Sequence, residues 1–217
     1  MQWLDLTFIH FEVEAAKLRK LLPAGVELDL HGGKAWIGLV PFRMEDVTRR
    51  GWPAPAWLCD FPEINVRTYV TVGGKRGVWF LSLDATNALA VWTARTFFHA
   101  PYFTAEVALT ETSEGINYSA RRGGRQFDAT CTPGDPASCQ PGSFAEWATE
   151  RYCLYSVSRN TGGLFRTEVQ HPKWPLQRGR IEIQTNTLSE VSLGPMHPEV
   201  LFSRQLDVVM WSLEQIN

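Results

Sequence analysis

Four polar residues occupy alternate positions in the segment Phe61–Val70, and their side chains have the types and spacing to act together. They are Glu63, Asn65, Arg67 and Tyr69. Alternate residues of an extended strand point to the same face, so we expect an acid, an amide, a guanidinium group and a phenol in one row. Such a row can bind a carbonyl or carboxylate group, and its acid can act as a general acid or base.

The segment that follows indicates that this row is inside the fold. Residues 77–84 read as a strand that is apolar on both faces until its end, which is typical of a strand buried on both sides. Its neighbour in the sheet should therefore also be buried. Buried polar groups must hydrogen bond with one another or line a cavity, so the sequence predicts an interior polar site.

Familiar cofactor and metal motifs are absent from the sequence. It contains no GxGxxG, GxxxxGK[ST], HExxH or GxSxG pattern, and we expect no cofactor. The four cysteines, Cys59, Cys131, Cys139 and Cys153, include no CxxC pair, and the five histidines are widely dispersed. We therefore expect no metal site, and isolated thiols rather than disulfides.

Composition favours one globular unit of modest charge. The chain has 217 residues, of which 44% are hydrophobic, and a formal net charge of −2. No linker or internal repeat divides it, so we expect a single domain over residues 1–217. The weak negative charge argues against nucleic acid as a partner. Without a signal-like N-terminus or a long apolar run, we expect a cytoplasmic protein that does not contact membranes. Homo-oligomerisation stays open.

Short elements joined by turns predict the fold class. Helical spacing or capping predicts helices over residues 12–22, 86–98 and from Ser143 to about residue 152 or 154. The second of these is apolar almost all round and is expected to be buried. Strands are predicted over residues 26–30, 35–42, 61–70, 77–84, 103–110, 116–122, 126–131, 154–158, 164–170, 180–184 and 201–210. This pattern favours an α+β fold with mainly antiparallel strands in closed or nearly closed sheets.

A series of motifs resembles the YqjF-like bacterial proteins, a family of unknown function. The motifs are Phe61-x-Glu63-x-Asn65-Val66-Arg67-Thr68-Tyr69-Val70, Gly77-Val78-Trp79-Phe80-x-Ser82-Leu83-Asp84-Ala85, Ala94-Arg95, Pro101-Tyr102, Glu150-Arg151-Tyr152 and His171-x-x-Trp174-x-Leu176. The resemblance runs from Trp3 nearly to Trp211. It implies a fold similar to that of acetoacetate decarboxylase, a β-rich barrel or cone around an internal cavity.

The resemblance to acetoacetate decarboxylase also implies a chemical difference. Glu63 matches the acidic residue of that enzyme's site and Arg95 matches its arginine, but Tyr102 stands where the Schiff-base lysine belongs. A phenol cannot form an imine. None of the five lysines has a setting that replaces the missing one, so a Schiff-base decarboxylase is not expected.

We interpret the protein as one that binds a small organic carbonyl or carboxylate ligand through Glu63, Arg67, Arg95 and Tyr102. A second hypothesis is an enzyme in which Glu63 performs acid–base chemistry on a carbonyl compound without a covalent imine. A third is a structural polar core without a ligand, in which arginines neutralise buried acids. We further expect Glu63 to be buried and within ion-pair reach of Arg67 or Arg95.

Overall fold

A computed structural model describes residues 1–47, 59–158, 160–189, 191, 193 and 197–216. Within these residues the strands are β1 (Gln2–Val13), β2 (Glu27–Leu28), β3 (Ala35–Glu45), β4 (Phe61–Val72), β5 (Lys75–Ala85), β6 (Tyr102–Thr104), β7 (Glu106–Thr112), β8 (Gly115–Arg122), β9 (Arg125–Pro136), β10 (Cys153–Val157), β11 (Leu164–Gln170), β12 (Gln177–Asn186), β13 (Glu199–Asp207), β14 (Val209–Met210) and β15 (Glu214–Ile216). The helices are α1 (Ala15–Arg19), α3 (Ala88–Phe97) and α4 (Phe144–Thr149). The fold is therefore mainly β with a few short helices, as the sequence predicted.

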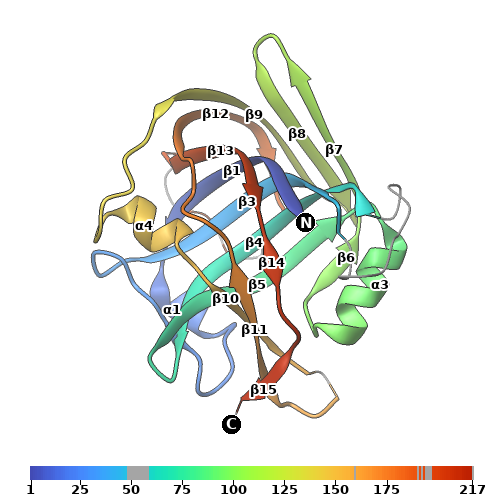
Figure 1. Cartoon of the computed structure of the whole chain (residues 1–217), viewed down its shortest axis with the longest axis vertical. Coiled ribbons are helices and arrows are strands. Elements are labelled where there is room, and N and C mark those ends of the chain that lie inside the picture. Colours follow the sequence, from blue (N-terminus) through green and yellow to red (C-terminus); the bar gives the residue numbers. More distant parts are fainter. Residues whose placement is uncertain (48–58, 159, 190, 192, 194–196, 217) are drawn as a thin grey trace.

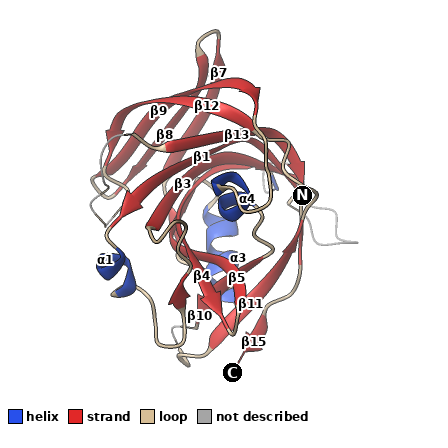
Figure 2. Cartoon of the chain, turned by 90° about the vertical axis from the view of Figure 1, so that its left-hand side faces the viewer, coloured by secondary structure: helices blue, strands red, loops and turns tan. Residues whose placement is uncertain are grey.

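The described strands are hydrogen bonded into one strongly curved sheet. Its order is β14-β11-β10-β5-β4-β3-β1-β13-β12-β9-β8-β7, with β2, β6 and β15 attached to its members. Most pairs are antiparallel, but β5 pairs in parallel with both β6 and β10, so the sheet is mixed. Figures 1 and 2 show the long central strands β1, β3, β4 and β5 curving past α4, with β7, β8 and β9 folded over one end.

The central strands are buried on both faces because each face carries its own hydrophobic layer. One layer joins β1, β3 and β4 to β8 and β9 through residues that include Phe11, Ile37, Ile64, Tyr118 and Phe127. The other joins the same central strands to β10, β11 and the segment before β12, through residues that include Phe8, Phe42, Leu154, Trp174 and Leu176. Side chains on either face of β4 are thereby removed from water, which is the condition that the interior site requires.

The N-terminal segment differs most from the sequence prediction. A helix was expected over residues 12–22, but the helix there spans only Ala15–Arg19, and the preceding residues form the 12-residue strand β1. No strand was predicted there. Because β1 pairs with β3 on one side and β13 on the other, these long-range hydrogen bonds outweigh the local helical spacing.

The segment after β5 also corrects the sequence prediction. The helix expected over residues 86–98 is present as α3, but it is not buried all round, since Leu89 and Trp92 are 48% and 60% exposed. The strand expected over residues 103–110 is two strands. The chain changes partner at Ala105, where β6 leaves β5 and β7 begins to pair with β8.

The capped helix α4 begins where the sequence placed it and ends earlier. The Ser143 side chain accepts a hydrogen bond from the backbone N–H of Glu146, as an N-cap does. Glu150 has φ −81° and ψ 70°, outside the helical region, so α4 ends at Thr149 instead of reaching residue 152 or 154. The strand predicted over residues 164–170 has the observed bounds of β11.

The cysteines agree with the sequence expectation. All four cysteines are free thiols, as expected. Across the described ranges, no helix is long and apolar enough to cross a membrane.

Candidate functional site

The alternating polar face of β4 is buried, as the sequence predicted. Glu63, Asn65, Arg67 and Tyr69 have exposed fractions of 2%, 4%, 8% and 0%. They share a face of β4 because side chains alternate along a strand, while Ile64 and its alternate neighbours join the hydrophobic layer on the opposite face. The row therefore lies inside the molecule, on the side of the second hydrophobic layer.

The Glu63 carboxyl group is held by Tyr102 and Asn65. Asn65 is opposite Leu83 on β5, and Leu83 is in turn opposite Tyr102 on β6, so this register brings the three polar side chains to one face. The Tyr102 hydroxyl and the Asn65 side chain both lie near the carboxyl group, and their hydrogen-bonding interaction with it lowers its pKa. One carboxyl oxygen, Glu63 Oε2, and the amide oxygen, Asn65 Oδ1, are buried without a hydrogen-bond partner.

Burial raises the pKa of Glu63 from 4.5 to about 8. The hydrogen bonds with Tyr102 and Asn65 lower this pKa and the nearby charge of Asp84 raises it, but loss of hydration is the largest effect. Burial and the neighbouring Glu63 carboxyl group also raise the pKa of Tyr102 well above 10. At neutral pH Glu63 is therefore mostly a neutral acid that can donate a hydrogen bond, and Tyr102 is a neutral phenol.

The expected ion pair between Glu63 and an arginine is wrong. The Arg67 guanidinium group lies 5.1 Å from the ring centre of Phe8 and donates hydrogen bonds to the Tyr69 hydroxyl and the Ala148 carbonyl. The charges that act on Glu63 include neither Arg67 nor Arg95. Burial without a cationic partner leaves a carboxyl group protonated, which explains its raised pKa.

Arg95 lies apart from the interior row. It is exposed on α3, with its guanidinium carbon 6.0 Å from the ring centre of Phe103. Asp84 is paired instead with Arg122, at 2.5 Å between Oδ1 and Nε, and Arg122 also covers Phe103. The structure thus brings together Glu63 and Tyr102 of the four predicted site residues, places Arg67 further along the same face, and separates Arg95 from them.

Sequence reasoning missed a second buried polar group, at the other end of the β4 row. His10 Nε2 lies 2.5 Å from the Tyr69 hydroxyl, and the Tyr69 ring packs 4.4 Å from that of Trp147 on α4. Gly38 of β3 is opposite both His10 and Arg67 in the sheet. A β-carbon there would lie 3.3 Å from the Tyr69 hydroxyl, so the glycine leaves room for this contact. A glycine within an apolar strand was the available signal.

Arg151 completes this second group. Its Nη1 lies 2.6 Å from Asp29 Oδ2, and its Nε donates to the Trp147 carbonyl at the end of α4. Arg76 pairs with the same Asp29 oxygen. Arg151 thus connects the end of α4 to Asp29, which follows β2.

Covalent and metal chemistry have few candidate groups in the described interior. All five lysines are exposed: Lys17, Lys20, Lys34, Lys75 and Lys173. Across the described ranges, no cluster of three or more His, Cys, Asp or Glu side chains is arranged to hold a metal ion. The interior site offers hydrogen-bond donors and one titratable acid.

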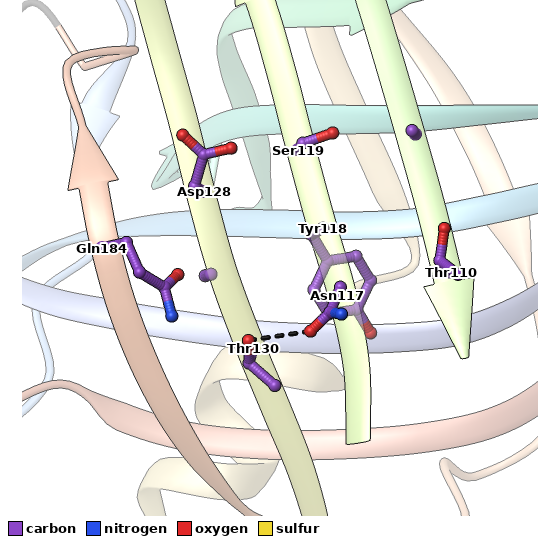
Figure 3. Close-up of a pocket in the computed structure, with 9 residues that line it drawn as sticks. Thr110, Asn117, Tyr118, Ser119, Asp128, Thr130 and Gln184 are labelled. Carbon is purple, nitrogen blue, oxygen red and sulfur yellow. Dashed lines mark hydrogen bonds between the residues drawn. The ribbon is translucent and has the colours of Figure 1, made fainter. Parts of the chain in front are cut away.

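The surface of the described residues includes two open depressions that the predicted site residues do not line. One, of about 420 Å³, lies over β7, β8 and β9, where the Thr130 hydroxyl donates to Asn117 Oδ1 at 2.8 Å (Figure 3). The other, of about 680 Å³, lies near both ends of the chain and includes His171 and Asp207. Glu63 lines neither of these two depressions.

Comparison with known proteins reveals a related sequence and several similar structures. Residues 1–207 match DUF2071, described as an uncharacterized conserved protein. The uncharacterized protein YqjF of Bacillus subtilis (strain 168) is 37% identical over 220 residues, which cover 98% of this chain and 90% of that protein.

Solved structures extend the likeness to the fold. The enduracididine biosynthesis enzyme MppR, in complex with pyruvate, superimposes with a TM-score of 0.74 at 14% identity, covering 100% of this chain and 89% of that one. Acetoacetate decarboxylase from Legionella pneumophila gives 0.71 at 15% identity, covering 100% and 87%. An acetoacetate decarboxylase-like enzyme from Sphingomonas wittichii RW1 gives 0.68 at 13% identity, covering 100% and 92%. The chain thus has the fold of these enzymes.

Proposed function

Because the chain belongs to the DUF2071 family and shares the fold of acetoacetate decarboxylase, we propose that it binds a small carbonyl compound at Glu63 and Tyr102. The similar structures include an enzyme bound to pyruvate and enzymes named for acetoacetate. Both molecules are small oxo acids. These similar structures support a ligand of that size and chemistry. The proposal requires an internal cavity at Glu63 that admits such a ligand.

The observation that carries the proposal is the state of the Glu63 carboxyl group. It is buried, its pKa is about 8, and Oε2 has no hydrogen-bond partner. A buried polar atom without a partner costs about 1–3 kcal/mol, which a ligand carbonyl would recover by accepting a hydrogen bond from the protonated acid. Tyr102 fixes the orientation of the acid through its own hydrogen bond.

Binding proceeds in this proposal without a covalent imine. The resemblance puts Tyr102 at the position of the Schiff-base lysine, and the exposure of all five lysines supports the absence of a replacement. A nucleophilic lysine needs burial or a neighbouring cation to lower its pKa from about 10.4. The ligand is accordingly held by hydrogen bonds alone.

An enzymatic role for Glu63 is the second candidate function, and its pKa favours it. A carboxyl group that titrates near pH 8 holds a proton at neutral pH and can release it there, as a general acid–base group requires. Such a group beside a bound carbonyl would exchange the protons on the adjacent carbon. The structural polar core stays the competing hypothesis, since Glu63 is buried and lines neither of the two surface depressions.

The first test measures ligand binding. Pyruvate and acetoacetate are titrated by calorimetry into wild type, Glu63→Gln, Tyr102→Phe and a surface control, Glu182→Gln. We expect wild type and the control to bind equally, and the two interior variants to bind at least about 10-fold more weakly through loss of a buried hydrogen bond. Equal binding by all four proteins, or none by wild type, contradicts the proposal.

Borohydride and heavy water separate the mechanisms. Reduction in the presence of each oxo acid should leave the protein mass unchanged, and a reduced adduct on any lysine contradicts hydrogen-bonded binding. Proton exchange of the bound oxo acid in heavy water, lost in Glu63→Gln, would select the enzyme over the binding protein.

A further inference from the structure

Two buried arginines flank the ring of Tyr69, and among the described residues an acid pairs with Arg151 but not with Arg67. The guanidinium carbons of Arg67 and Arg151 lie 5.5 Å and 4.9 Å from the ring centre, and the residues are 8% and 6% exposed. Arg151 is paired with Asp29 at 2.6 Å. For Arg67, the interactions seen across the described residues are hydrogen bonds to neutral oxygens and contacts with aromatic rings.

The described titratable groups on the same face as Arg67 supply no negative charge. Burial, together with the charges of Arg67 and Arg151, lowers the pKa of His10 well below 6.5, so this imidazole is neutral. Glu63, on the same face of β4, is mostly protonated at neutral pH. A buried cation that is not paired is strongly unfavourable. The buried charge of Arg67 is therefore expected to destabilise the folded protein when no ligand is bound.

Hydrogen bonding of Arg67 is also incomplete. The two hydrogen bonds from its Nη2 are long, 3.3 Å to the Tyr69 hydroxyl and 3.4 Å to the Ala148 carbonyl. Its Nε is buried without a partner. A guanidinium group has five N–H donors in a planar fork that matches a carboxylate, and this one keeps donors available.

Together these observations point to the charge of the ligand. We infer that Arg67 binds the carboxylate of an oxo acid whose carbonyl group is held at Glu63, so that the ligand lies along the interior face of β4. This inference rests on the proposed function and narrows its ligand class from carbonyl compounds to anionic oxo acids. Tyr69, held by His10, positions the Arg67 guanidinium group for this contact.

Acid and ester pairs test the inference directly. Pyruvate, acetoacetate and 4-oxopentanoate, each with its methyl ester, are titrated into wild type, Arg67→Met and Arg180→Met. Arg180 is a matched control because its side chain is 81% exposed. We expect wild type and the control to bind an acid roughly 10- to 100-fold more tightly than its ester, as charged hydrogen bonds provide, and Arg67→Met to lose this preference. The same preference in Arg67→Met overturns the inference.

Thermal melting of the empty protein separates a binding role from a structural one. Replacing Arg67 by Met removes an uncompensated buried charge, so we expect a melting temperature no lower than that of wild type. Arg151→Met removes the buried one of the two arginines that pair with Asp29 and should melt at a lower temperature. If Arg67→Met melts as low as Arg151→Met, Arg67 is a structural residue and the inference fails.

Failure of the inference and failure of the proposed function give different results. Esters that bind in a Glu63-dependent way, with no preference for the acids, overturn the carboxylate role of Arg67 and leave the proposed function supported. Binding of neither acids nor esters contradicts both.

Discussion

The protonation state of Glu63 is the residue-scale property with the clearest physical consequence. Asp84 contributes repulsion and no arginine offsets it, so burial dominates the pKa of this carboxyl group. The difference between about 8 in the folded chain and 4.5 in the unfolded chain corresponds to roughly 5 kcal/mol at 1.36 kcal/mol per pH unit.

This difference predicts how stability depends on pH. Between pH 4.5 and about 8 the folded protein keeps a proton that the unfolded chain has lost, so stability falls as pH rises through this window. Glu63→Gln cannot titrate, and we expect its free energy of unfolding to rise relative to that of wild type by roughly 5 kcal/mol across the window. Urea denaturation at closely spaced pH values measures this difference.

A surface control accompanies the measurement. Glu182→Gln changes an acid whose side chain is 65% exposed, so its stability should follow that of wild type at each pH. A constant difference between Glu63→Gln and wild type from pH 4.5 to above 8 would show that Glu63 titrates normally.

At the scale of elements, β5 is the strand on which the site depends. It pairs with β4 antiparallel and with β6 and β10 in parallel, so it connects Asn65 to Tyr102. Its pairing with β10 requires a residue without a side chain at Gly77. A β-carbon there would lie 2.6 Å from the Tyr155 ring and 2.8 Å from the Cys153 carbonyl oxygen.

Gly77→Ala should therefore destabilise the protein. Neither the ring nor the backbone carbonyl can move away without disturbing β10, and we expect a loss of roughly 1–3 kcal/mol, as overpacking usually costs. Urea denaturation measures the loss, with Gly134→Ala as control, because a β-carbon at Gly134 would approach nothing nearer than the Arg178 carbonyl oxygen at 3.2 Å. Equal losses in the two variants would argue against close packing of β5 on β10.

At the scale of the whole molecule, the lysines are confined to the surface. All five lie on the exposed surface, and several are engaged there by acids, such as Lys75 with Glu168 at 2.6 Å. The interior faces of the curved sheet carry arginine, tyrosine and histidine instead.

Reductive methylation should reach every lysine of the native protein. We expect formaldehyde and a borane reductant to dimethylate all five without unfolding, since each ammonium group is accessible and keeps its charge. Mass spectrometry counts the modified lysines, and the melting temperature before and after reports the fold. A lysine that reacts only in denaturant would reveal a buried amine and reopen imine chemistry.

Local pattern was sufficient for several elements and insufficient for others. The bounds of β11 and the N-cap of α4 followed from periodicity and capping, which depend on neighbouring residues. The strand β1 was not predicted, because it is specified by its pairing with β3 and β13, and the latter is about 200 residues away along the chain. The change of partner at Ala105 escaped prediction for the same reason.

The sequence by itself determined that one face of β4 carries polar side chains, because strand alternation is a local property with a period of two residues. It also indicated that this face is buried, because the strand that follows is apolar on both faces. The tertiary structure alone decided their partners. Glu63 lies with Tyr102 and Asn65 rather than with an arginine, and Arg67 lies against Tyr69 and Ala148. Partner choice depends on sheet register and on packing between distant segments, and these in turn set the pKa of Glu63 and the unpaired charge of Arg67.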